Sequence, residues 1–96
     1  MSKQPLDKQP LEDFDLLSKL IVGIGEVSEI TGVSPRQIRY WEEKEYISSS
    51  KNSNSKTRRY DYYQIKKIIL IKDYMTEGYT LEAAVEKTTT RLAYFN

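Results

Sequence analysis

The chain of 96 residues is 39% hydrophobic and 30% charged, which suits one small soluble globular domain. It has no cysteine and no histidine, which excludes disulfides, thiolate and imidazole catalysis, and the usual zinc and iron ligands. We therefore expect a protein that is not an enzyme and that uses no cofactor or metal. The sequence has no apolar run long enough to cross a bilayer and no signal peptide at its start, so we expect a cytoplasmic location without membrane contact.

The formal net charge of +1 conceals an uneven distribution of charge along the chain. Residues 34–72 contain ten Lys and Arg against four Asp and Glu, whereas residues 1–33 and 73–96 are both acidic. A basic block within a nearly neutral chain indicates a face that binds a polyanion. An ordinary solvated surface is the alternative interpretation of the same charges.

The N-terminal part predicts a tail followed by two helices. Residues 1–10 are polar, contain two prolines and are expected to be disordered. Apolar residues at helical spacing then predict an amphipathic helix over 11–22, which Gly23 and Gly25 end as turn residues. A short helix over 26–31 follows, with apolar positions at Val27 and Ile30.

A tight turn is predicted to connect this short helix to the next one. Gly32 can adopt the left-handed conformation that ends a helix, and Ser34 can cap the following helix. Pro35 suits the first helical position, and Gln37 at the third position can form a capping box with Ser34. A helix, a tight turn and a second helix together predict a helix-turn-helix.

The second helix of this unit has an apolar side and a polar side. Ile38 and Trp41 lie three residues apart and are assigned to the core. The other side has polar and basic side chains near the helix N-terminus, where a recognition helix places its DNA-contacting residues. These side chains are Arg36, Gln37, Arg39 and Tyr40.

A hairpin with a basic tip is predicted to follow. Ile47 is expected to begin a short strand, residues 57–60 a second strand, and the Ser- and Asn-rich segment between them a loop. A solvated linker is the alternative interpretation of this segment. The hairpin contains four positive charges without an acid among them: Lys51, Lys56, Arg58 and Arg59.

Two further helices complete the predicted domain. Asp61 and Gln64 can form a second capping box at the start of a helix over 62–77. Gly78 is expected to end that helix and Thr80 to cap a fourth, whose Thr-rich end is expected to fray. The predicted apolar stripes are Ile65, Ile68, Ile69 and Tyr74 in the former helix and Leu81, Ala84, Val85, Thr88 and Leu92 in the latter.

Over about residues 24–85 this ordered set of motifs resembles the DNA-binding domain of the MerR family of bacterial transcription regulators. The family's opening pattern is matched by IGEVSEITGVSPRQIRYWEEKEYI, and its wing strand and following helix pair by TRRYDYYQIKKIILIKDYMTEGYTLEAAV. The resemblance implies a mainly α fold, a winged helix-turn-helix with a small β-hairpin wing, here preceded by the extra N-terminal helix. We assign residues 23–92 to this domain and 93–96 to a tail or the start of a dimerisation helix.

The resemblance also implies the partner and the site. The recognition helix would enter the major groove of double-stranded DNA, and the wing would lie on the flanking backbone. Such proteins act as homodimers on the bacterial nucleoid, and no small-molecule effector can be assigned here. Tyr40 would donate its hydroxyl to a phosphate, whereas Trp41, where the family often has tyrosine, would pack instead. The candidate DNA-contacting residues are Ser34, Arg36, Gln37, Arg39, Tyr40, Lys51, Lys56, Arg58, Arg59 and Tyr60.

Two other functions remain open from the sequence. The first is an excisionase-like architectural protein that bends DNA at recombination sites; an adjacent integrase gene would favour it. The second is a winged helix that has lost DNA binding and serves as a protein-interaction module; failure to bind duplex DNA at low salt would favour that. The extent of the match through the fourth helix and the charge of the wing favour a transcription regulator.

Overall fold

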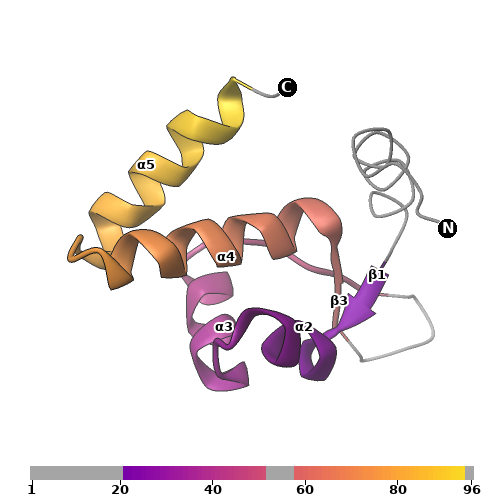
Figure 1. Cartoon of the computed structure of the whole chain (residues 1–96). Helices are drawn as coiled ribbons and strands as arrows, with labels where there is room; N and C mark the ends of the chain where they lie inside the picture. The colour runs from indigo at the N-terminus through magenta and orange to yellow at the C-terminus, as the bar shows by residue number, and fades with distance from the viewer. Residues whose placement is uncertain (1–20, 52–57, 95–96) are drawn as a thin grey trace, which may run out of the picture.

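A computed structural model of the chain describes residues 21–51 and 58–94. In Figure 1, α4 crosses above α2 and α3, and α5 leads away from the end of α4 that is distant from the strands. The prediction of a mainly α, winged helix-turn-helix fold is confirmed. The elements are β1 (Ile21–Gly23), α2 (Ile24–Thr31), α3 (Pro35–Glu43), β2 (Ser50–Lys51), β3 (Arg58–Asp61), α4 (Tyr62–Thr76) and α5 (Leu81–Ala93).

The sheet has three antiparallel strands in the order β1-β3-β2. The predicted hairpin corresponds to β2 and β3, in which Ser50 pairs with Arg59 and Lys51 with Arg58. The prediction that Ile47 begins a strand is wrong: Ile47 is 2% exposed and packs in the core before β2 starts. Most of the predicted basic tip, including Lys56, lies outside the described residues.

The strand β1 replaces the end of the predicted N-terminal helix. The tail over 1–10 and most of the helix over 11–22 lie outside the described residues, but Ile21 and Val22 belong to a strand. Val22 pairs with Tyr60 of β3, so the two residues gain ladder hydrogen bonds that a short helix end would not offer. The sheet is therefore wider by one strand than the predicted hairpin.

The helix α2 starts earlier than predicted and buries a different side. The carboxylate of Glu26 accepts the backbone N–H of Gly23 at 3.1 Å, so Gly25 lies inside the helix and is not a turn residue. Val27 is fully buried as predicted, but Ile30 is 58% exposed. Thr31 occupies the buried position in its place and is 5% exposed.

The turn between α2 and α3 is closed by backbone and side-chain hydrogen bonds. Gly32 has φ +78°, the left-handed conformation predicted for it, and its N–H donates to the Ser28 carbonyl at 2.8 Å. The Thr31 hydroxyl donates to the Val27 carbonyl at 2.8 Å and accepts the Val33 N–H at 3.1 Å. These bonds fix the direction in which α3 leaves the turn.

The core lies between α4 and the helix-turn-helix. Ile38 and Trp41 are 0% and 1% exposed, as predicted, and Ile68 and Ile71 of α4 are buried beside them in the same cluster. The expected fraying of α5 does not occur: the helix continues to Ala93, with Thr88 and Leu92 buried. The buried cluster consists of Val27, Val33, Ile38, Trp41, Ile47, Tyr60, Ile65, Ile68, Ile71 and Ala84.

Across the described ranges, no helix has both the length and the apolar content that a membrane span requires.

Candidate nucleic-acid interface

The helix α3 presents the predicted polar side chains on its exposed side. Its start is fixed by Ser34, whose hydroxyl accepts the Gln37 N–H at 3.1 Å, and by Pro35 in the first turn. Because Ile38 and Trp41 face the core, the remaining side of the helix faces solvent. Four of the predicted site residues lie there, namely Arg36, Gln37 and Arg39, which are exposed, and Tyr40, which is 48% exposed.

The wing brings its two arginines next to each other on β3. Successive residues of a strand point to opposite faces, so Arg58 and Arg59 project in opposite directions. Arg59 is exposed, whereas Arg58 is half-buried and faces α3. Lys51 lies directly across from Arg58 in the β2–β3 register. The described wing therefore carries Arg58 and Arg59 on opposite faces of β3, with the backbone of Lys51 paired to that of Arg58.

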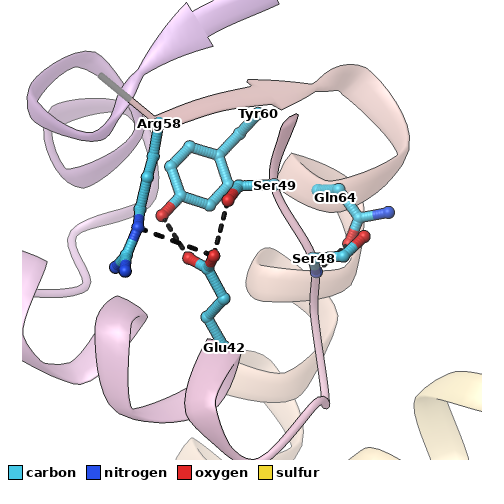
Figure 2. A network of polar contacts seen from close by, with 6 residues as sticks. All are labelled: Glu42, Ser48, Ser49, Arg58, Tyr60 and Gln64. Carbon is cyan, nitrogen blue, oxygen red and sulfur yellow. Dashed lines mark hydrogen bonds and ion pairs between the residues drawn. The ribbon is translucent and has the colours of Figure 1, made fainter. Parts of the chain in front are cut away.

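A carboxylate at the end of α3 connects the recognition helix to the wing (Figure 2). Glu42 accepts the Tyr60 hydroxyl at 2.7 Å on one oxygen and the Ser49 hydroxyl at 2.5 Å on the other. The Arg58 Nε lies 3.7 Å from the same oxygen that Ser49 contacts. No role of Glu42 was predicted from the sequence, in which the one available signal is its place within the RYWE motif.

Tyr60 was predicted to contact DNA, but its side chain lies in the core. Its side chain is fully buried, so it supports the interface from within the core and is not available at the surface. Burial, and after it the hydrogen bond to Glu42, together raise the pKa of Tyr60 from 10.0 to about 12. The positive charges of Arg58 and Arg39 act in the opposite direction and lower this pKa.

Gln64 makes a contact other than the predicted capping box. The Asp61 carboxylate accepts the Gln64 N–H at 3.0 Å, as expected for a cap of α4. The Gln64 side chain does not return to Asp61; its oxygen accepts the Ser48 N–H at 2.9 Å. This contact ties the start of α4 to the segment that leads into β2 (Figure 2).

Lys72 holds the helix-turn-helix from above. Its ammonium group donates to the Thr31 carbonyl at 3.0 Å, at the C-terminal end of α2, where a positive charge is favourable. A Cβ at Gly32 would lie 2.8 Å from that nitrogen. Lys72 therefore acts in the fold, as a contact between α4 and the turn.

A helix-turn-helix with a flanking β wing, and with cations exposed on both, defines the class of the winged helix-turn-helix domains. The profile described as MerR HTH family regulatory protein matches residues 23–90, which is more than half of the chain. The chain therefore belongs to the MerR HTH family. This is a family of regulatory proteins and not a class of enzymes.

Curated relatives have the same domain within longer chains. The chain is 37% identical over 67 residues to the HTH-type transcriptional regulator TnrA of Bacillus subtilis (strain 168), covering 70% of this chain and 60% of that protein. It is 33% identical over 64 residues to the HTH-type transcriptional regulators GlnR of Bacillus anthracis and Bacillus cereus, covering 67% of this chain and 49% of each of them. The match thus spans 60% of the length of TnrA and about half of the length of the GlnR proteins.

Proposed function

We propose that this protein binds specific sequences in double-stranded DNA and thereby regulates bacterial transcription. In this proposal α3 enters the major groove and the β2–β3 wing lies on the flanking backbone. The observation that supports it most directly is the exposed face of α3, where two arginines and a tyrosine lie away from the buried Ile38 and Trp41, with a glutamine at the edge of that face. Membership of a regulatory family and the regulators among its relatives support the same function.

Each exposed side chain of α3 has a chemical role in this proposal. Arg36 and Arg39 can donate two hydrogen bonds to the edge of guanine or grip a phosphate, and Gln37 can pair with adenine. A good bidentate pair discriminates against the wrong base by about 1–3 kcal/mol. Tyr40 would donate its hydroxyl to a phosphate. Arg59 and Lys51 on the wing would add sequence-independent affinity by releasing counterions from the backbone.

We further propose that the active form is a homodimer on an inverted repeat. One domain of this size contacts a single half-site, so two copies are needed for a long operator and for tight binding. Residues 23–92 would form the DNA-binding unit of each copy, and residues 93–96 would lead toward the dimer contact. The protein would work in the cytoplasm, on the nucleoid.

Fluorescence anisotropy with a labelled duplex at two salt concentrations tests the proposal. The Arg36→Ala/Arg39→Ala double variant should bind more weakly and should fold normally, because both side chains are exposed. Each phosphate contact that is lost should reduce the slope of log affinity against log salt by about 0.9. The matched control is Lys66→Ala/Arg91→Ala, which removes the same charge from exposed positions on α4 and α5 and should bind as wild type does.

Other outcomes would favour the other functions. Binding in which both double variants weaken equally would reject the assignment of α3 as the recognition helix. Wild-type protein that binds no duplex even at low salt, and that captures a defined protein, would support an interaction module. Tight binding with strong DNA bending but no effect on a promoter would support the excisionase-like function.

A further inference from the structure

An acid lies where α3 meets the wing, between the two parts of the proposed DNA-binding face. Glu42 belongs to the last turn of α3, and its side chain is 19% exposed. A carboxylate repels DNA phosphates, so on electrostatic grounds alone it weakens the binding of a polyanion. Its three partners come from two other segments: Ser49 before β2, and Arg58 and Tyr60 in β3. The carboxylate therefore links the recognition helix to the wing.

The contact with Arg58 leaves the outer part of that side chain available. The Arg58 Nε faces Glu42 at 3.7 Å, and the side chain is 36% exposed. Figure 2 shows the two terminal nitrogens of the guanidinium pointing away from the carboxylate. A guanidinium presents several donors in one plane, so an acid can hold one edge while the other edge meets a phosphate.

Resting on the proposed function, we propose that Glu42 is a positioning residue, which holds the wing against α3 and aims Arg58 at a DNA phosphate. The carboxylate contacts Arg58 and Tyr60 of β3 at the same time. An ion pair restrains the guanidinium before DNA binds, so less conformational freedom is lost when it meets a phosphate. This gain offsets the repulsion between the acid and the DNA.

Two substitutions distinguish a positioning role of Glu42 from a purely structural one. Glutamine has nearly the same shape and can still form hydrogen bonds with Ser49 and Tyr60, but it cannot hold a guanidinium by charge. Glu43, the next residue, is an exposed acid on the same helix. Changing Glu43 to Gln alters the net charge identically, so the two variants differ in the loss of the contact with Arg58.

The experiment is a double-mutant cycle on DNA affinity in the full chain, using the duplex that wild type selects from a random pool. Glu42→Gln should weaken binding about three- to tenfold, and Arg58→Ala by a similar factor, whereas the double variant should be no weaker than Arg58→Ala. Glu42→Gln and Arg58→Ala should both reduce the salt slope by about 0.9. Glu43→Gln should bind as tightly as wild type or more tightly, because it removes an acid near DNA.

A second measurement uses the wild-type protein and so does not depend on how a variant folds. Nitrogen-15 relaxation of the arginine side chains should show the Arg58 Nε–H ordered in the absence of DNA, in contrast to the exposed Arg36. Equal mobility at the two positions would overturn the proposal.

Different outcomes would contradict the proposed DNA binding and the positioning role of Glu42. If wild type binds no duplex, the proposed function is wrong and this inference falls with it. If wild type binds but Glu42→Gln costs the same with and without Arg58, or tightens binding as Glu43→Gln does, the positioning role alone is wrong. Non-additivity together with an ordered Arg58 supports it.

Discussion

Ile38 and Trp41 attach α3 to the core with apolar surface, and the turn before α3 closes through the left-handed Gly32 and the hydroxyl of Thr31. The wing also has a side chain in the core, that of Tyr60, but polar contacts add to its attachment. Glu42 and Gln64 hold it through hydrogen bonds to residues 18 and 16 positions away. Apolar burial involves no charge that salt can screen, whereas a partly exposed ion pair is weakened by salt. The helix that would read bases is thus fixed mainly by packing, and the wing by the buried Tyr60 together with polar contacts.

The largest effect should come from the apolar attachment. Trp41→Ala removes a fully buried indole, and truncations of this kind cost about 3–5 kcal/mol, so the domain should be largely unfolded. Trp41→Phe should cost much less, since it keeps most of the packing and removes a buried N–H that has no partner among the described residues. Urea unfolding followed by circular dichroism measures both. Equal losses for the two variants would mean that packing is not the main contribution of Trp41 to the free energy of unfolding.

The second-largest loss of stability should come from the turn of the helix-turn-helix. Gly32→Ala places a side chain at φ +78° and pushes a Cβ against the Lys72 ammonium, so we expect a loss of about 2 kcal/mol. Lys72→Ala, which removes the contact but keeps the glycine, should cost less. Thermal unfolding of the single variants and of the pair separates backbone strain from the lost contact. A Gly32→Ala variant as stable as wild type would contradict the left-handed turn.

The burial of Tyr60 and its contact with Glu42 should make the stability of the protein depend on pH in alkaline solution. Near neutral pH, Tyr60→Phe should cost about 1.5 kcal/mol, because Glu42 loses a donor. The Tyr60 pKa is about 12 in the folded state against 10.0 for an ordinary tyrosine, so the folded state holds this proton more tightly. The associated stability is complete below pH 10 and is lost as pH rises toward 12, on the order of 2–3 kcal/mol in all.

The matched control for that prediction is an exposed tyrosine. Tyr63→Phe removes a hydroxyl from a side chain that is 39% exposed and should follow the wild-type pH profile throughout. Tyr60→Phe should lose less stability than wild type above pH 10, so the gap between the two should narrow. Denaturant midpoints across this range give the comparison. A constant gap would show that Tyr60 keeps an ordinary pKa in the folded protein.

The smallest effect concerns the end of α3. Glu45 has φ +65° and occupies the position at which a helix end favours glycine: its N–H donates to Glu42, and the Tyr46 N–H donates to Trp41. Glu45→Gly should therefore raise stability by about 0.5–1 kcal/mol. Glu43→Gly, inside the helix, should lower it. Thermal unfolding distinguishes the signs, and destabilisation by Glu45→Gly would contradict the backbone conformation.

Features that depend on a few neighbouring residues were predictable from the sequence. The caps at Ser34, Asp61 and Thr80 each bond an N–H three residues later, so the pattern and the contact lie in the same short stretch. The burial of Ile38 and Trp41 follows from helical spacing alone. The exposed face of α3 was predictable for the same reason, since the residues that do not face the core must face solvent.

Features that depend on pairing across the chain were not predictable. The strand β1 has three residues and exists through its partner β3, so Ile21 and Val22 were assigned to a helix on local spacing. Glu42 and Gln64 find their partners only after the wing has folded back, and no local pattern separates Glu42 from its neighbour Glu43. Tyr60 was placed at the surface because a single alternation in a short strand does not show which face is buried.

Trp41 is the sole tryptophan in the chain; it is buried and lies on the same helix as the exposed Arg36 and Arg39. Its indole N–H has no partner among the described residues, and an indole in such apolar surroundings emits at shorter wavelength than one in water. The fluorescence of Trp41 therefore reports both on folding and on changes at α3. Selective excitation of tryptophan gives one signal from one site, free of any label, for unfolding, for ligands that touch α3, and for each variant above that retains Trp41.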